Sequence, residues 1–303
     1  MSDSKVKIST FSGHKEPVYA LASGPEVGTF FSSGGDRYVV KWDLQNPDTG
    51  VPIVQVPSSV YAFQYIETKN QLLVASNKDG LHLVDLENNM EIWSFPTPLN
   101  NWFRMLEFQN EIWIAGSEGA VLVFNIETRK IDTKRFGKHD LRSMDVDALG
   151  QTFAFGNSNQ EIFIFNLNTG FNSSISEAHK STIFGLQFYP FGNRLVSCGR
   201  DAKLKIWAQN QEGKWQSENE IAAHLFGIHD VKIHPTKPIL ATASTDKTIK
   251  IWDAESLKLL RVLDKTRHAG HGHSINQLLW LKKPELLLSC SDDRTISAWD
   301  IFA

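Results

Sequence analysis

The sequence predicts an all-β fold in which seven small antiparallel sheets form a radial array. One aromatic or aliphatic residue recurs along the whole chain at intervals of 40 to 47 residues. Its seven copies are Trp42, Val84, Phe124, Phe165, Trp207, Trp252 and Trp299. A repeat of this length is typical of architectures in which each repeat packs against its neighbours. Each repeat also divides into short apolar runs separated by turn residues, which is the pattern of antiparallel strands.

The sixth repeat shows the expected strands most clearly. Its four apolar runs lie at residues 228–233, 239–243, 248–252 and 257–263. Pro235 and Asp246 supply two of the turns between these runs. Four strands of about five residues make one antiparallel meander. Both faces of such a sheet are apolar, so we expect each sheet to pack between two copies of itself.

The seventh repeat supplies only three strands of its own. They are expected at residues 275–280, 286–291 and 295–301. The alternating segment Lys5–Phe11 belongs to no other repeat, and an unpaired sheet edge is normally covered. We therefore expect Lys5–Phe11 to pair beside residues 295–301 and to close the ring. The whole chain, residues 1–303, is then one domain.

Four of the repeats carry the same polar residues in register. A His lies 28 residues before the Trp, a Ser or Thr ten before it and an Asp six before it. The sets are His14, Ser32, Asp36 and Trp42; His179, Ser197, Asp201 and Trp207; His224, Thr242, Asp246 and Trp252; and His271, Ser289, Asp293 and Trp299. With the pairs Gly13-His14 and Trp42-Asp43, this register resembles the WD-repeat family of seven-bladed β-propellers over essentially the full chain.

The resemblance implies a structural role for these polar sets. In the family, the His, the hydroxyl, the Asp and the indole form a hydrogen-bonded chain, and buried indoles and carboxylates both need such partners. Ser, His and Asp together also suggest catalysis, but a set that recurs four times around a ring indicates framework. The second to fourth repeats lack the pattern, and Asp79 is the candidate for the Asp position in the second. We expect these repeats to depend on packing instead.

The first strand of each repeat indicates where a partner binds. Its apolar residues step by three and then by two, which favours a β-bulge. In the family, the residue at that bulge points toward the rim of the central channel, on the face that carries the turn Asp. The partner-binding candidates at or next to this position are Tyr19, Tyr61, Trp102, Arg104, Arg142, Phe184, Arg200 and His229.

Aromatic residues and arginines dominate these candidates, and these types carry much of the binding energy at protein interfaces. We expect a non-catalytic scaffold or adaptor that binds a protein or peptide there. An acidic peptide could pair with Arg104 or Arg142 while an apolar side chain stacks on Trp102 or Phe184. The alternative roles are large side chains that fill a narrow channel, and a propeller hydrolase or lyase at the channel mouth. Catalysis needs converging groups of perturbed pKa, and one His does not supply them.

Composition argues against several other classes of protein. Formal net charge is −3 without a basic stripe, which argues against nucleic-acid binding. The N-terminus lacks the apolar core of a signal peptide, and no apolar run reaches the length of a membrane span. Cys198 and Cys290 occupy equivalent positions in non-neighbouring repeats, so we expect no disulfide, a reducing compartment and a cytoplasmic location.

No phosphate-cradling motif is present, and we expect no cofactor. His268, His271 and His273 form a local cluster, but His271 belongs to a framework set, so we expect no metal site. We expect a chain that is monomeric by itself and is a member of a larger complex.

Overall fold

The computed structural model describes residues 6–97, 101–170, 172–190 and 194–303. Within these ranges the chain forms seven four-stranded antiparallel sheets, and the fold is the seven-bladed β-propeller that the repeat predicts. We number the blades by the order of their first strands, so that the first blade is β2–β5 and the seventh is β26–β28 with β1. Among the described residues, no helix has the length and hydrophobicity of a membrane-spanning segment.

The chain divides into two structural units. The first unit comprises the residues up to Asn101 with Lys247–Ile251 and Leu260–Ala303, and the second comprises Trp102–Asp246 with Trp252–Leu259. In the first unit lie β1 (Lys7–Ser12), β2 (Val18–Ser23), β3 (Thr29–Gly34), β4 (Tyr38–Asp43), β5 (Val51–Gln55), β6 (Val60–Ile66), β7 (Gln71–Ser76), β8 (Gly80–Asp85), β9 (Met90–Pro96), β26 (Ile275–Leu281), β27 (Leu286–Ser291) and β28 (Thr295–Trp299), together with the short helix α1 (Lys265–His268) and the 3-10 turn η1 (Glu67–Lys69).

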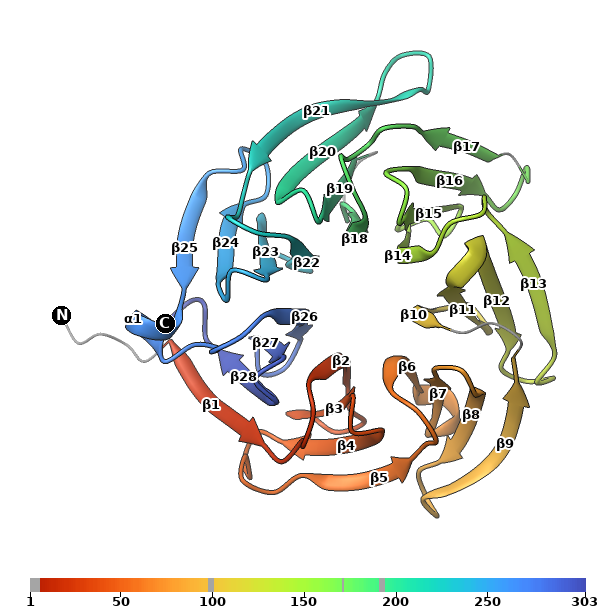
Figure 1. Cartoon of the computed structure of the whole chain (residues 1–303), viewed down its shortest axis with the longest axis vertical. Coiled ribbons are helices and arrows are strands. Elements are labelled where there is room, and N and C mark those ends of the chain that lie inside the picture. Colours follow the sequence, from red (N-terminus) through yellow and green to blue (C-terminus); the bar gives the residue numbers. More distant parts are fainter. Residues whose placement is uncertain (1–5, 98–100, 171, 191–193) are drawn as a thin grey trace. The chain divides into compact units, whose positions relative to one another are not determined.

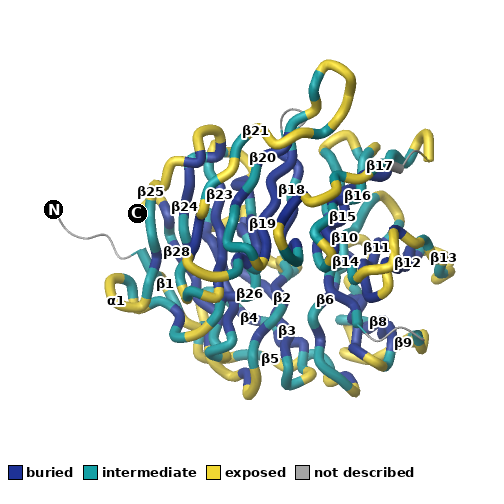
Figure 2. Tube along the Cα trace, turned by 45° about the horizontal axis from the view of Figure 1, so that its top comes forward, coloured by how far each residue is buried: buried dark blue, intermediate teal, exposed yellow. Residues whose placement is uncertain are grey.

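The remaining strands follow the same meander. In the second unit lie β10 (Trp102–Phe108), β11 (Glu111–Gly116), β12 (Ala120–Asn125), β13 (Ile131–Arg135), β14 (Leu141–Val146), β15 (Thr152–Asn157), β16 (Ile162–Asn166), β17 (Asn172–Ile175), β18 (Ile183–Phe188), β19 (Arg194–Gly199), β20 (Lys203–Gln209), β21 (Trp215–Ala222), β22 (Ile228–Ile233) and β23 (Ile239–Ser244), with the 3-10 turn η2 (Ser117–Gly119). The sixth blade is β22 and β23 with β24 (Ile249–Asp253) and β25 (Leu259–Leu263). Buried residues concentrate in the inner strands, whereas the turns and outer strands such as β9 and β13 are more exposed (Figure 2).

The N-terminal strand completes the seventh blade, as expected. β1 pairs antiparallel with β28, with Lys7 opposite Trp299 and Ser12 opposite Thr295 (Figure 1). Phe11 on this strand is fully buried and packs edge-on against Phe30 at 4.9 Å between ring centroids. β1 therefore supplies the fourth strand of the seventh blade and also packs against the first blade. The expected strand began at Lys5, which lies outside the described residues.

The four polar sets form the predicted hydrogen-bonded chains. In each, the indole N–H of the Trp donates to the Ser or Thr hydroxyl at 2.7 to 2.9 Å. The His imidazole lies 2.7 to 2.8 Å from the same hydroxyl. Its other nitrogen lies 2.8 to 3.0 Å from the carboxylate of the turn Asp. Each set thus ties the turn before a blade to that blade's second and third strands.

The blades without these sets use other contacts, as expected. Trp113 in the third blade stacks on Phe153 in the fourth with ring centroids 4.0 Å apart, and Phe136 stacks on Phe155 at 4.5 Å. In the second blade, Asp79 does pair with a histidine. That histidine is His82 on β8, at 2.6 Å, rather than one before the blade's first strand.

Candidate functional site

A β-bulge interrupts the first strand of every blade, as the spacing of apolar residues predicts. The register shift in each first strand passes over one residue. These residues are Tyr19, Tyr61, Phe103, Arg142, Phe184, His229 and Asn276. The bulge therefore places five of the predicted binding residues as expected.

The third blade corrects the expected register by one residue. The shift lies between Trp102 and Arg104, so Phe103 and not Arg104 occupies the bulge. Trp102 then takes the first apolar position of the strand and is fully buried, so it offers no surface to a partner. Two successive aromatic residues fit the spacing equally well, and burial of the larger one decides between them.

Arg104 consequently points into the protein. Its guanidinium lies 3.3 Å from the Asp230 carboxylate and donates to the backbone carbonyls of Phe184 and His229 at 3.3 and 3.4 Å. Both members of the ion pair are largely buried. Arg104 therefore links β10 to β18 and β22, and it does not present the free bidentate donor that we expected for an acidic peptide.

The bulge residues of the second unit stack on one another. The guanidinium carbon of Arg142 lies 3.9 Å from the centroid of the Phe103 ring and 5.5 Å from that of Phe184. On Phe184, in turn, the His229 imidazole stacks with centroids 5.1 Å apart and planes inclined by 23°. Cation–π and aromatic contacts of this kind hold large side chains in fixed positions. Three predicted residues, Arg142, Phe184 and His229, are thus brought together.

A hollow of about 550 Å³ opens beside this stack. Its lining includes the predicted residues Phe184, Arg200 and His229, and also Leu225, Phe226 and Thr245. Leu225 and Phe226 are 83% and 61% exposed, which is unusual for two consecutive large apolar residues. We call this hollow and its apolar rim the 225–226 site.

Hydrogen bonds to neighbouring residues of the sixth blade fix the turn that carries Leu225 and Phe226. The N–H of Leu225 donates to Asp246, and the Ser244 hydroxyl donates to the carbonyl of Phe226 at 3.1 Å. A Cβ at Gly227 would lie 3.3 Å from the Cα of Arg200, so glycine allows the turn to approach Arg200 closely. The two apolar side chains are therefore presented outward by an anchored backbone.

Our sequence interpretation did not include Leu225 and Phe226. A signal was available, because the other framework histidines are followed by Lys15-Glu16, Lys180-Ser181 and Gly272-His273. Two apolar residues at this place are the exception among the four sets.

The carboxylate of the 225–226 site is unsuited to acid–base chemistry. Asp201 is the one carboxylate among the described residues that line the hollow. Burial raises its pKa, but hydrogen bonds from His179 and from the backbone N–H of Lys180 outweigh this and hold the pKa at about 2. A carboxylate with so low a pKa is a poor general base at neutral pH.

The bulge residues of the first unit have different neighbours. Tyr19 and Tyr61 stack with ring centroids 4.4 Å apart. Burial raises the pKa of Tyr19, and Tyr61, Asp292 and Glu16 add to this effect. Unlike Arg142 of the second unit, which stacks on aromatic rings, this tyrosine pair lies near carboxylates.

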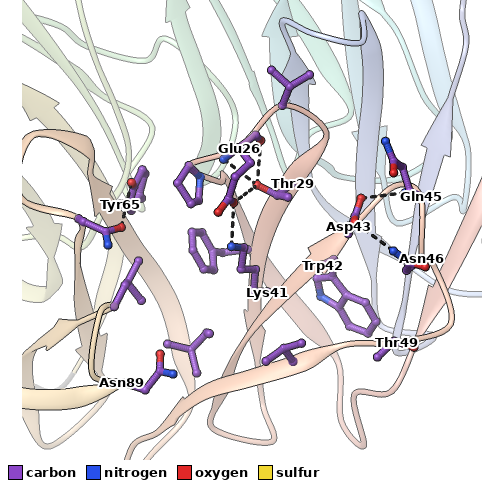
Figure 3. Close-up of a pocket in the computed structure, with 17 residues that line it drawn as sticks. Glu26, Thr29, Lys41, Trp42, Asp43, Gln45, Asn46, Thr49, Tyr65 and Asn89 are labelled. Atoms are coloured by element: carbon purple, nitrogen blue, oxygen red, sulfur yellow. Dashed lines mark hydrogen bonds and ion pairs between the residues drawn. The ribbon is translucent and has the colours of Figure 1, made fainter.

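A larger hollow of about 1060 Å³ lies in the first unit between the turns of the first two blades (Figure 3). Its polar side chains pair with one another, since Glu26 bonds both Thr29 and Lys41. Similarly, Asn46 donates to Asp43 and Tyr65 donates to Asn70. Because these groups already satisfy one another, the hollow makes a weaker case for a binding site than the 225–226 site.

The expected cysteine and histidine assignments can be placed as well. Cys198 and Cys290 are buried and form no disulfide. His271 joins the framework set of the seventh blade, whereas His268 lies in α1. In the part of the chain that the structure describes, no three His, Cys, Asp or Glu side chains gather at metal-binding distance.

Four-stranded sheets, bulged first strands and His-hydroxyl-Asp-Trp chains together define a β-propeller built from sequence repeats. The family model described as WD domain, G-beta repeat matches residues 5–43, 172–208, 215–253 and 259–300, which together exceed half of the chain. The chain belongs to this WD-repeat family. The matched segments are those that contain the four polar sets.

Two longer proteins are similar to most of the chain, and a third is similar to a smaller part of it. Transducin beta-like protein 3 of Rattus norvegicus is 22% identical over 96% of this chain and 40% of its own length. Nuclear distribution protein PAC1 of Arthroderma otae is 28% identical over 95% of this chain and 59% of its own length. Transcriptional corepressor LEUNIG_HOMOLOG of Arabidopsis thaliana is 42% identical over 37% of this chain and 14% of its own length. The chain thus spans less than two thirds of each relative.

Proposed function

We propose that the protein is a non-catalytic scaffold or adaptor that binds a protein or peptide partner at the 225–226 site. The observation that carries this proposal is the exposed pair Leu225 and Phe226 on an anchored turn beside a hollow. Exposed apolar residues of this kind mark interaction surfaces. Membership of the WD-repeat family supplies the scaffold, and function depends on the surfaces that the scaffold carries.

The lining of the site indicates the chemistry of the partner. Phe184 and Phe226 offer aromatic surface to an apolar anchor side chain, and Arg200 is exposed at the edge of the hollow. A short segment with an apolar residue next to an acidic one would match both features, because Arg200 could pair with the carboxylate while the apolar residue is desolvated. Tyr19 and Tyr61 are proposed as separate contacts of the first unit.

The remaining expectations stay proposals. We propose a cytoplasmic location in a reducing compartment, which the reduced state of Cys198 and Cys290 supports. We also propose that residues 1–303 act as one binding domain that joins a larger complex without contacting nucleic acid or membrane.

The experiment compares proteins retained by three immobilised forms of the chain. These are the unmodified protein, the variant Leu225→Ser/Phe226→Ser and the control Leu149→Ser, whose leucine is equally exposed at 79% in another turn of the second unit. A partner of the 225–226 site is retained by the control and lost by the double variant. Titration of that purified partner should then show a Kd raised at least about tenfold by the double variant alone. Equal Kd values for all three forms would place the partner elsewhere.

A further inference from the structure

A second surface lies at the seventh blade, where β1 is the outermost strand. β1 hydrogen-bonds β28 on one side only, so among the described strands none pairs with its outer edge. A groove of about 990 Å³ separates residues 6–10, most of them in β1, from α1 and Ala269 after it. An open strand edge presents main-chain donors and acceptors that can pair with an added strand.

The groove is basic. Its lining contains Lys7, Lys265, Arg267 and His268, and of the described residues that line it none is acidic. Arg267 is partly neutralised by Asp264, at 2.6 Å, whereas Lys265 is exposed on the same turn. This concentration of positive charge is notable because the chain as a whole has a formal net charge of −3.

Two side-chain nitrogens beside the groove have no hydrogen-bond partner among the described residues. They are Nδ1 of His268, which lines the groove, and a guanidinium nitrogen of Arg261 on the preceding strand β25, whose charge acts on His268. Buried polar atoms of this kind are normally satisfied. The positive charge of Arg261 adds to the basic character of this edge.

We propose that an extended acidic segment of a partner protein adds to the outer edge of β1 as a fifth strand of the seventh blade. Its backbone would pair with the edge of residues 6–10, and its carboxylates would face Lys265 and Arg267. A nucleic acid would match the charge but not the open backbone edge, and the described residues that line the groove include no Phe, Tyr or Trp on which a base could stack. This surface is separate from the 225–226 site and does not rest on it.

Binding at this edge has a consequence for stability. β1 is the strand that completes the seventh blade, so a ligand that pairs with β1 only when it is docked favours the closed blade by mass action. The partner would therefore raise the melting temperature and slow hydrogen exchange in β1.

The test uses a short peptide that alternates Glu and Val, with blocked ends. Fluorescence anisotropy should show saturable binding, and hydrogen-exchange mass spectrometry should show protection of residues 6–12. The same peptide methylated on alternate backbone nitrogens should not bind, because it cannot form a strand. Lys265→Glu/Arg267→Gln should weaken binding at least about tenfold. The control Lys282→Glu/Lys283→Gln makes the same change in net charge in an exposed turn of the same unit and should leave binding unchanged.

The double variant Leu225→Ser/Phe226→Ser should also bind the Glu-Val peptide normally, which separates this proposal from the proposed function. Equal binding of the methylated peptide would overturn strand addition and leave only a cationic surface. Equal losses in both charge variants would show non-specific attraction. Protection of β1 by single-stranded DNA or anionic vesicles but not by the peptide would assign the groove to another class of ligand.

Discussion

At the residue scale, the turn carboxylates of the framework sets differ from carboxylates on the surface. The Asp201 side chain is 6% exposed and bonds His179 and two backbone N–H groups, whereas the Asp79 side chain is 38% exposed. Asp201→Ala or Asp246→Ala should therefore lower the free energy of unfolding by about 2–4 kcal/mol. Asp79→Ala should lower the free energy of unfolding by less. Denaturant titration of the three variants checks this, and equal small losses would show that the sets do not stabilise the fold.

The low pKa of Asp201 also predicts a pH dependence. Its folded pKa of about 2 lies below the ordinary value of 3.8, so its contribution is present above that ordinary value and is lost as pH falls through about 2. The stability difference between the unmodified protein and Asp201→Asn should shrink over this window. A difference that stays constant from neutral to acidic pH would contradict the charged hydrogen bond.

Asp145 behaves in the opposite way. Its carboxylate accepts the N–H of Phe188 at 2.7 Å from the neighbouring blade, and burial raises its pKa to about 6. The equivalent bond between the fifth and sixth blades uses the neutral side chain of Gln187, which accepts the N–H of Ile233. Because the folded pKa is raised, the contribution of Asp145 is fully present below about 3.8 and is lost as pH rises through about 6.

Asp145→Asn keeps an acceptor for Phe188 without the charge, so it should be more stable than the unmodified protein at mildly alkaline pH. The gain should disappear at a pH below about 4, where the native carboxyl is neutral. Unfolding free energies measured at both pH values test this, with the exposed Asp132→Asn as the control. A gain that is independent of pH would mean that the charge of Asp145 is not its cause.

At the element scale, the spacing of apolar residues predicts where the strands and bulges lie better than it predicts which side chains are exposed. The spacing of apolar residues is sufficient to locate the bulges at Val18–Ala20 and Ile228–Asp230, because burial alone selects those positions. It does not decide between Trp102 and Phe103, since both are apolar. The spacing of apolar residues also does not predict that Leu225 and Phe226 are exposed. Their exposure depends on hydrogen bonds that fix the turn to Asp246 and Ser244, which are distant in the sequence.

The closing strand carries the main prediction at this scale. Removal of residues 1–12 deletes β1 and leaves β28 with an open edge, so the melting temperature should fall sharply or the protein should aggregate. Phe11→Ala probes the same strand without deleting it and should cost about 3–5 kcal/mol, because the ring is fully buried against Phe30 and Trp42. Unchanged thermal unfolding of both variants would show that β1 does not hold the seventh blade.

At the scale of the whole molecule, the blades are held together by two different means. The blades matched by the family model use buried polar chains, and the third and fourth blades use stacked aromatic rings such as Trp113 on Phe153. The repeat predicts the number of blades because every copy has the same length. The repeat does not predict a contact that only one pair of blades makes. The pair of Arg104 with Asp230 is the clearest case, because these two residues occupy equivalent positions in the third and sixth blades and yet differ in charge.

The ion pair of Arg104 with Asp230 is predicted to support both the fold and the 225–226 site. Arg104 also bonds the carbonyls of Phe184 and His229, which line that site, so its loss should disturb the hollow as well as the core. Arg104→Met should lower the free energy of unfolding by about 3 kcal/mol, because Asp230 loses its buried ion pair.

The double variant Arg104→Met/Asp230→Asn should recover part of that loss in a double-mutant cycle, since it also removes the buried carboxylate that pairs with Arg104. Partner affinity at the 225–226 site should stay reduced, because the bonds to the two carbonyls are still missing. Arg104→Met could instead lower the affinity for the partner without lowering the free energy of unfolding. That result would show that Arg104 contacts the partner directly and that its ion pair with Asp230 does not stabilise the fold.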